Sequence, residues 1–344
     1  MLTVFSESHR LHYGIELKDG LIARSFENPQ RADTVVARVR AAGLGEVIGE
    51  THYDRSHYVG AHSDRYVHFL ETAWAEWSAT GRNHDALPLV WPVRTLRDDI
   101  EPSFIDGKLG YYAMDAGSPI GAHTWEAVCS SANVALTGAD VVLAGARAAF
   151  ALCRPPGHHA AREYMGGYCY LNNAAIAAQR CLAHGARRVA VLDVDFHHGN
   201  GTQDIFYERA DALFVSLHGD PRVSFPYFSG FADEEGRGAG LGFNANYPLP
   251  EGTDWPRYSD ALGDAGKRLT AYAPDVLVVS LGVDTFEGDP ISHFALTSSD
   301  FIRLGEAIAR LGLPTLFVME GGYMVDEIGT NAVNVLLGFE GRAA

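Results

Sequence analysis

The chain has 344 residues, of which 47% are hydrophobic and 20% are charged. This composition is typical of a globular protein with a large core, and no repeat or low-complexity tract points to a fibrous or disordered class. The formal net charge of −16 disfavours nucleic acid as a partner, because such binding depends on Lys and Arg side chains that neutralise phosphates. An acidic surface suits a cationic substrate, although it would serve solubility equally well.

The sequence carries no signal for a membrane or for an oxidising compartment. No apolar run is long enough to cross a bilayer, and the first ten residues lack the basic segment and the long apolar core of a signal peptide. The four cysteines, Cys129, Cys153, Cys169 and Cys181, form no CxxC pair and lie among small or apolar residues. We therefore expect free thiols, a cytoplasmic location and no membrane partner.

In chain order, short apolar runs alternate with segments of helical periodicity. The expected strands are 3–5, 150–153, 189–192, 213–217, 276–281 and 315–319. The expected helices are 31–42, 65–79, 125–148 with an interruption near Gly138, 172–183, 258–271, 300–311 and 325–337. Strands that alternate with helices imply parallel pairing, and hence an α/β protein. Prolines and glycines interrupt the pattern between residues 80 and 124, and a loop of that length is often functional.

Polar, glycine-rich sequence follows four of these strands. The four stretches are 154–159, 193–200, 282–284 and 320–323. In open parallel sheets, ligands bind beyond the carboxyl ends of the strands. The topology therefore predicts that these four stretches meet at one site.

The stretch after residues 189–192 contains side chains that suit a metal. Side chains of a strand alternate between its faces, so Asp193, Asp195 and His197 are expected to point the same way. A polar strand end that caps a helix is the simpler alternative, but a cap does not need three convergent groups. Asp195, His197 and Asp284 together offer two carboxylates and one imidazole, which suit a catalytic zinc with an open position, and manganese or iron would also accept them. Shortly after His197, the residues Gly199-Asn-Gly201 predict a tight turn whose backbone approaches the site.

A metal held by two carboxylates needs a separate proton acceptor, and the pair His158-His159 meets that need. One imidazole can take the proton of water and the other can protonate the leaving group. Asp193 could orient one ring and Asn200 the other. Isolated histidines are more often structural, but two adjacent ones at a strand end beside the ligand strand favour catalysis.

Tyr323 follows Gly321-Gly322, which let the backbone turn the phenol into a cleft. A phenol near a metal can stabilise an oxyanion, whereas a packed surface tyrosine would be the default elsewhere. Metal, acid–base pair and oxyanion donor together fit hydrolysis of an amide or a similar carbonyl compound.

Six segments carry a resemblance to a known family. They are Arg154-Pro-Pro-Gly-His-His, Gly166-Gly-Tyr-Cys-Tyr-Leu-Asn172, Asp193-Val-Asp-Phe-His-His-Gly-Asn-Gly201, Ser216-Leu-His218, Ser280-Leu-Gly-Val-Asp284 and Glu320-Gly-Gly-Tyr323. With them the chain resembles the zinc-dependent histone deacetylase superfamily, and within it the bacterial acetylpolyamine amidohydrolases. The likeness runs nearly end to end. It implies the arginase/deacetylase fold, with one catalytic domain over residues 1–344 and a single central parallel sheet of about eight strands flanked by helices.

The resemblance also implies roles for individual residues. Asp195, His197 and Asp284 would hold zinc, His158 would be the general base, His159 the general acid, and Tyr323 would polarise the acetyl carbonyl. Gly167 and Tyr168 on one side and Phe225 on the other would wall a narrow channel. A structural potassium would use Asp193, Asp195, His197, Ser216 and Leu217, mostly through backbone oxygens.

In the polyamine branch the long loop helps to form a dimer that narrows the entrance. The insertion at about 80–124 is therefore expected near the active-site entrance and a homodimer interface. Asp106 falls where such enzymes carry an acid for the distal ammonium of the substrate. A second acid is missing at Gly117, and Asp115 is the candidate substitute. Asn200 departs from the Asp of several protein deacetylases but matches the polyamine branch.

The expected function is zinc-dependent removal of acetyl groups from small cationic amines of the acetylputrescine or acetylcadaverine type. The alternative is a deacetylase of acetyl-lysine in proteins, which would need an open entrance. An inactive acyl-binding module is disfavoured because all the ligand, acid–base and phenol groups are present. Ureohydrolases share the implied fold, but their two-manganese site needs more Asp and His ligands than this sequence shows.

Overall fold

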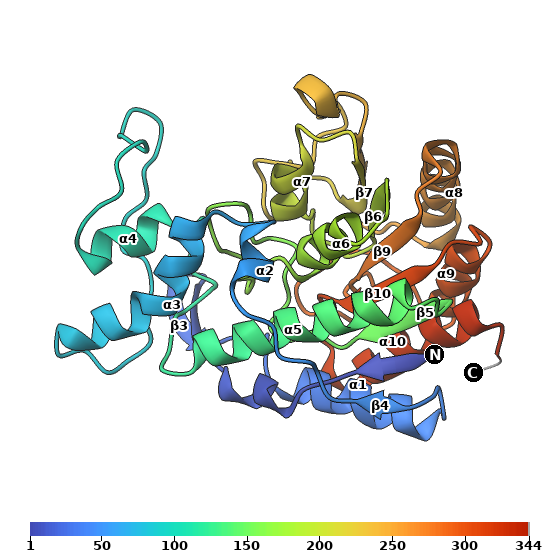
Figure 1. Ribbon diagram of the computed structural model, residues 1–344, viewed down its shortest axis with the longest axis horizontal. Coiled ribbons are helices and arrows are strands. Elements are labelled where there is room, and N and C mark those ends of the chain that lie inside the picture. The colour runs from blue at the N-terminus through green and yellow to red at the C-terminus, as the bar shows by residue number, and fades with distance from the viewer. Residues whose placement is uncertain (343–344) are drawn as a thin grey trace.

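Eight parallel strands form the central sheet, in the order β4-β1-β5-β10-β9-β6-β7-β8 (Figure 1). The computed structural model describes residues 1–342. The strands are β1 (Leu2–Val4), β4 (Val47–Ile48), β5 (Ala148–Ala151), β6 (Val189–Asp193), β7 (Ala212–Gly219), β8 (Asn244–Leu249), β9 (Val276–Leu281) and β10 (Thr315–Met319). The expected α/β class and the parallel sheet of about eight strands are confirmed.

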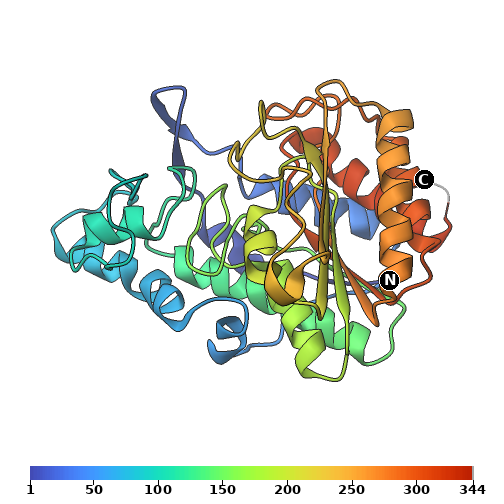
Figure 2. The ribbon, with the colours of Figure 1, turned by 90° about the horizontal axis from the view of Figure 1, so that it is seen from above.

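Helices cover both faces of this sheet, so that α8 and α5 lie on opposite sides of it (Figure 2). One face packs against α2 (Ser56–Val59), α3 (Asp64–Ala79), α5 (Thr124–Leu143) and α6 (Asn173–Ala183). The other packs against α1 (Gln30–Ala41), α8 (Trp255–Tyr272), α9 (Asp300–Ala309) and α10 (Val325–Glu340). Strands β6, β9 and β10 are buried along their full length, which explains their continuous apolar sequence.

Two expectations about single elements are wrong. Helix α5 continues through Gly138, because a Cβ there would lie 2.7 Å from Cδ1 of Leu316 on β10, so the glycine permits close packing instead of a break. Residues 199–201 form no isolated turn and start the helix α7 (Asn200–Phe206). The chain still approaches the site there, since the backbone N–H of Gly201 donates to His158 O at 3.0 Å.

Four strands escaped the sequence pattern. The edge strand β4 has two residues, and β8 contains two asparagines and a proline, which are rare in strands. An N-terminal hairpin, β2 (Ile15–Lys18) with β3 (Leu21–Arg24), forms a separate antiparallel sheet. Short 3₁₀ helices occupy Glu7–Leu11 and Gly238–Gly240.

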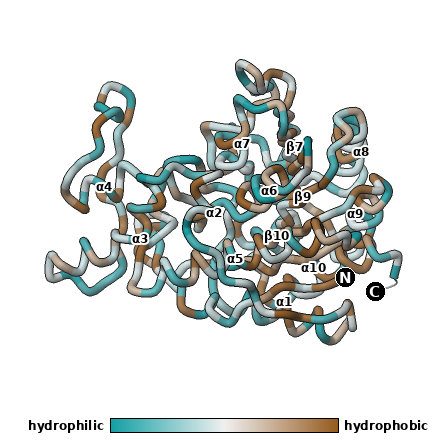
Figure 3. Tube along the Cα trace, in the orientation of Figure 1, coloured by the Kyte–Doolittle hydropathy of each residue, from teal (hydrophilic) through white to brown (hydrophobic). Residues whose placement is uncertain are grey.

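The segment 80–124 is closed at its base and contains a helix. An isolated antiparallel bridge joins Ala86 to Ile120, and α4 (Ile105–Tyr111) lies between them. The segment projects from the end of the molecule that lies away from α8 and α9 (Figure 1). It carries apolar side chains as well as polar ones (Figure 3), and six of the apolar ones are exposed: Leu89, Val90, Val93, Leu96, Ile100 and Phe104. These side chains lie within residues 88–104, which we call the projecting segment.

The four cysteines are free thiols, as expected, and three of them are buried. Across residues 1–342, none of the helices has the length and hydropathy needed to cross a bilayer.

Candidate metal and hydrolytic site

Three ligand-type side chains meet where β6 and β9 end. The ligand atoms of Asp195, His197 and Asp284 all lie within 4.8 Å of one another, and all three residues are buried. His197 Nδ1 is 2.9 Å from Asp284 Oδ2, and the backbone N–H of His197 donates to Asp195 Oδ1 at 2.9 Å. Strand β6 ends at Asp193, so Asp195 and His197 come from the loop after it. Asp193 does not join the cluster as strand alternation suggested, and instead contacts His158.

Two glycines leave space for the carboxylates of this cluster. A Cβ at Gly321 would lie 2.5 Å from Asp195 Oδ2 and 2.6 Å from Asp284 Oδ2, and a Cβ at Gly282 would also collide with Asp195. The backbone N–H of Gly321 donates to Asp195 Oδ2 at 2.8 Å. Any side chain at these positions would displace the carboxylate of Asp195 or Asp284, which explains the glycines better than a need for flexible backbone does.

The electrostatics of the cluster fit a divalent cation. Burial, together with the neighbouring Asp195 carboxylate, raises the pKa of Asp284 to about 8. Two buried carboxylates this close repel each other unless a positive charge lies between them. Two carboxylate oxygens and one imidazole nitrogen are ligands that zinc, iron and manganese all accept.

The two adjacent histidines have opposite environments. His158 Nδ1 is 3.0 Å from Asp193 Oδ2, and its Nε2 is 3.8 Å from Asp195 Oδ1. Burial lowers the pKa of His158, but the Asp195 and Asp193 carboxylates outweigh that effect and raise it to about 10. His159 Nδ1 donates to Asn200 Oδ1 at 2.7 Å, and burial together with the charge of His158 lowers its pKa. His159 is therefore the neutral imidazole of the pair.

Two residues that the sequence did not indicate, Asp289 and Arg31, contact Tyr323. Its N–H donates to Asp289 Oδ2 at 2.7 Å, and Gly322 before it has φ of +125°. Burial raises the pKa of Tyr323, so the phenol keeps its proton. The Arg31 guanidinium lies 4.8 Å from the centre of the Tyr323 ring and donates from Nε to Gly322 O at 2.6 Å.

Arg31 belongs to a buried ion cluster beneath the site. Glu27 Oε1 lies 2.8 Å from Arg31 Nη1 and 2.8 Å from Arg154 Nε. Glu27 lies before the start of α1 and Arg31 lies in its first turn, so their spacing is not that of a helical face and did not indicate the ion pair or its contact with the site.

A cavity of about 390 Å³ opens above these groups. Its lining includes the three predicted wall residues, Gly167, Tyr168 and Phe225. Four other predicted site residues also line it: His159, His197, Tyr323 and Asp115. Phe225 packs edge-on against His159, with ring centres 5.0 Å apart, and Tyr168 lies 5.7 Å from Tyr323. The hairpin β2–β3 contributes Glu16 to this lining, which the sequence did not suggest.

Asp106 does not reach this cavity within its own chain. It lies on α4, where its Oδ1 is 2.6 Å from Arg82 Nη1, and it is absent from the described lining. Asp115 does line the cavity, where it accepts hydrogen bonds from the N–H groups of Gly117 and Gly167 at 2.9 and 2.8 Å.

The residues expected around potassium are neighbours in the sheet. Asp193 of β6 lies opposite Ser216 of β7, and Leu217 is the next residue of that strand. Ser216 Oγ is 2.8 Å from His218 Nδ1. The register brings these residues together, and the ion itself stays a prediction.

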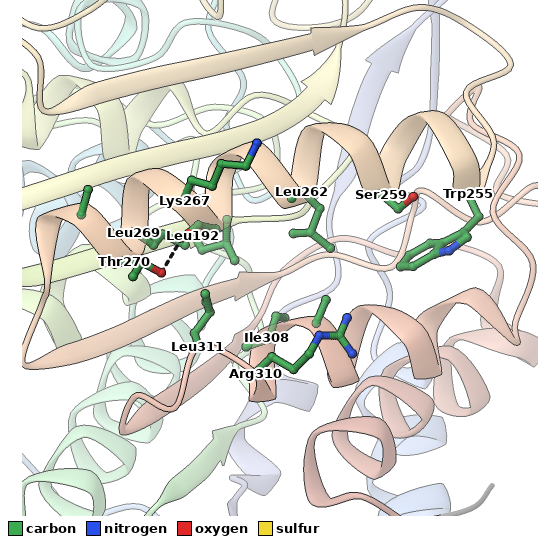
Figure 4. Close-up of a pocket in the computed structure, with 14 residues that line it drawn as sticks. Leu192, Trp255, Ser259, Leu262, Lys267, Leu269, Thr270, Ile308, Arg310 and Leu311 are labelled. Carbon is green, nitrogen blue, oxygen red and sulfur yellow. Dashed lines mark hydrogen bonds between the residues drawn. The ribbon is translucent and has the colours of Figure 1, made fainter.

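A larger hollow of about 570 Å³ lies between α8 and α9, on the far side of the sheet from α5. Leu262, Leu269, Ile308 and Leu311 form much of its wall (Figure 4). None of the residues predicted for the site lines it, so the chemistry belongs to the smaller cavity.

The chain belongs to the histone deacetylase family, because the family model described as the histone deacetylase domain matches residues 25–339. This membership confirms the expected class of enzyme, a hydrolase of amide bonds. Within the family it groups with the bacterial acetylpolyamine amidohydrolases. It is 61% identical to acetylpolyamine amidohydrolase 2 of Pseudomonas aeruginosa, over 99% of each chain, and 51% identical to acetylpolyamine amidohydrolase of Mycoplana ramosa, over 99% of this chain and 100% of that one.

Two solved structures are also similar to this chain in fold and in sequence. A crystal structure of acetylpolyamine aminohydrolase from Burkholderia pseudomallei superposes with a TM-score of 0.93 at 42% identity, covering 98% of both chains. The HD domain of HDA15 superposes with a TM-score of 0.81 at 27% identity, covering 99% of this chain and 88% of that one.

Proposed function

We propose that the chain is a zinc-dependent hydrolase that removes acetyl groups from acetylated polyamines and diamines. The observation that carries the proposal is the cavity whose wall includes His159, Tyr323 and His197. The carboxylates of Glu16, Asp19 and Asp115 also line it and suit a cationic substrate. The names of the relatives with which it groups support the same substrate class.

Asp195, His197 and Asp284 would hold the metal. When bound there, a divalent zinc supplies a Lewis acid and lowers the pKa of water. A potassium ion beside Asp193 and Ser216 is proposed as a structural companion.

The protein's own groups move the protons. The resemblance assigned the base to His158 and the acid to His159, but the environments favour another division. His159 lines the cavity, is neutral, and has Nε2 free to accept because Nδ1 donates to Asn200. We therefore assign the acceptance of the water proton, and its later delivery to the leaving amine, to His159. His158, held charged by Asp193, stays a fixed cation that stabilises developing negative charge. Tyr323 donates its phenol proton in a hydrogen bond to the acetyl oxygen.

The rim of the cavity favours a positively charged amine. Glu16 is buried with 5% exposure, and its oxygens accept only from neutral groups, Tyr168 Oη at 2.9 Å and Phe26 N at 3.3 Å. Neither Glu16 nor Asp115 has an ion-pair partner within residues 1–342. Lys18, the only lysine or arginine of the described lining, lies 4.1 Å from the centre of the Phe26 ring. A substrate ammonium would offset this uncompensated charge.

A homodimer and a cytoplasmic location complete the proposal. The exposed apolar side chains of the projecting segment support association with a second copy, because patches of this kind usually mark interfaces. Asp106 can act on substrate only if the entrance is shared with that copy. Four free thiols suit a reducing cytoplasm.

A direct comparison of substrates tests the function. The zinc-loaded protein should hydrolyse acetylputrescine and acetylcadaverine with higher kcat/KM than an acetyl-lysine peptide. Higher efficiency on the peptide would replace the polyamine assignment with the protein deacetylase alternative. Activity on neither would remove the proposed function.

A further inference from the structure

The loop that carries Phe225 is anchored at its base by a partly buried polar cluster. The loop joins β7 to β8, and its tip is poorly covered, since Tyr227 and Phe228 are 51% and 92% exposed. Its backbone hydrogen bonds near the tip are local, such as Tyr227 N to Ser224 O at 3.0 Å. The position of Phe225 over His159 must therefore be fixed largely from the base of the loop.

Glu234 is the centre of that base. Its Oε2 accepts three hydrogen bonds, from the backbone N–H of Gly230 at 2.8 Å, from Gln203 Nε2 at 2.7 Å and from Asn246 Nδ2 at 3.2 Å. Gln203 also donates to Ser229 Oγ at 3.1 Å. One carboxylate oxygen thus connects the loop to helix α7 and to strand β8.

Both backbone polar groups of Gly230 have partners outside the tip of the loop. While its N–H donates to Glu234, its carbonyl is 2.8 Å from His218 Nε2 of β7. Gly230 has φ of +107°, and a Cβ there would lie 2.7 Å from His218 Nε2 and 2.8 Å from Cγ of His198. The backbone of the loop therefore rests directly on two buried imidazoles, and only glycine allows this approach.

The cluster also reaches the hydrolytic site. Gln203 lies on α7, the helix that starts at Asn200, the acceptor for His159. Asn246, which donates to Glu234, also meets the ring of His198, the neighbour of the ligand His197, at 3.2 Å. A continuous set of hydrogen bonds thus connects the loop, helix α7 and His198, the residue after His197.

We propose that Glu234, with Gln203, is a positioning residue that fixes the Phe225 wall of the cavity and thereby sets affinity for the acetylated chain. Glu234 is not one of the described lining residues, and its side chain bonds to Gln203, Gly230 and Asn246, so its proposed effect on substrate is indirect, through Phe225. The effect on substrate rests on the proposed function, whereas the effect on the loop does not.

Three variants of the zinc-loaded enzyme test the proposal. Glu234→Ala removes the acceptor of three donors, and it should raise KM for acetylputrescine about tenfold, because small displacements of a wall disturb binding geometry, with kcat within about twofold. Glu234→Gln keeps an acceptor oxygen and should stay close to the wild type. Glu235→Ala, at an exposed neighbour whose side chain makes no hydrogen bond or ion pair within residues 1–342, is the matched control.

Two readouts separate positioning from a general loss of structure. Amide hydrogen exchange over residues 222–231 should speed up in Glu234→Ala and not in the other two variants. In a double-mutant cycle, Glu234→Ala should add no further rise in KM once Phe225→Ala is present, because both changes remove the same wall.

Unchanged KM or unchanged exchange in Glu234→Ala would overturn the inference, and so would additive effects with Phe225→Ala. If the wild type itself fails to hydrolyse acetylputrescine, the proposed function fails. The exchange comparison still decides whether Glu234 fixes the loop.

Discussion

Asp284 and His159 lie within the same small site, and their different surroundings lead us to propose different roles for them. Asp284 belongs to the ligand cluster, whereas His159 faces the cavity with its Nδ1 on Asn200. We predict that Asp284→Ala lowers both bound zinc and turnover, while His159→Ala keeps the metal and loses turnover. Metal analysis alongside turnover checks this, and equal loss of zinc in both variants would contradict the division.

In the proposed mechanism, Tyr323 donates a hydrogen bond and does not bind the metal. Its phenol keeps its proton because burial raises its pKa. We predict that Tyr323→Phe leaves the zinc content unchanged and lowers kcat by about 100- to 1000-fold, the usual cost of losing one oxyanion donor. Single-turnover rates measure the effect, and near-normal turnover would remove Tyr323 from the chemistry.

We infer that Glu16, a buried carboxylate in the cavity lining, favours substrates with a positive charge. We predict that the wild type prefers monoacetylated diamines over an uncharged acetylated alkylamine of equal length. Glu16→Gln keeps the acceptor for Tyr168 but loses the charge, so it should reduce this preference by about tenfold, mainly through KM.

The comparison variant is Asp106→Asn. Asp106 is paired with Arg82 outside the cavity of its own chain, so Asp106→Asn should reduce the preference only through the shared entrance of the proposed dimer, and an unchanged preference would contradict that shared entrance. Equal efficiency of the wild type on charged and uncharged substrates at low salt would contradict the polyamine assignment.

Residues that follow strands could be predicted from the topology. Gly167, Tyr168 and Asp115, which come from other segments, were predicted only through the family resemblance. Asp195, Asp284, His158 and Tyr323 were found because parallel topology brings strand ends together. Glu16 enters from a hairpin outside the main sheet, and nothing in its local sequence indicates where that hairpin lies.

At the scale of elements, His62 links the start of α3 to the start of α6. Its Nδ1 is 2.8 Å from Ala161 O, and its Nε2 accepts from Asn172 N at 2.9 Å, so the neutral ring fits both partners. Burial lowers its pKa to about 4. Since the unfolded chain takes up the proton at a pKa of about 6.5, the stabilisation is complete above that pH and declines as the pH falls toward 4.

We predict that His62→Gln, which keeps a donor and an acceptor without titrating, makes the free energy of unfolding less dependent on pH. Between pH 7.5 and 5 the variant should lose about 2 kcal/mol less than the wild type. Urea unfolding at both pH values measures the difference, and the other titrating groups, including His12, are common to both proteins. Parallel pH profiles would contradict the account.

The ends of an element could be predicted where its sequence pattern indicated only one kind of structure. Strands β9 and β10 begin and end at the expected residues, because a strand buried on both faces is apolar throughout. Gly138 was misread since a glycine in a helix indicates either a break or a close contact, and only the facing Leu316 decides between them. Strand β8 was missed because its asparagines are chosen for buried hydrogen bonds to Gln203 rather than for strand propensity.

At the scale of the whole molecule, the exposed apolar side chains of the projecting segment 88–104 are the basis of the dimer that we propose. Leu89, Ile100 and Phe104 are 82%, 56% and 58% exposed. We predict that the wild type is a dimer by light scattering, and that combining Leu89→Ser with Phe104→Ser gives a monomer. Leu241→Ser, at a residue 64% exposed outside this segment, should leave the dimer intact. A monomeric wild type would remove the dimer proposal.

The two edges of the sheet limit how such assembly can proceed. At one edge, β4 offers only two residues for pairing, and at the other β8 contains Pro248, which lacks an N–H donor. Short or proline-bearing edges resist the addition of a foreign strand. A chain with exposed apolar side chains and open edges would be at risk of polymerising without limit. In the dimer that we propose, the side chains of one segment make the contact between copies, so that association would close on itself instead of growing into fibres.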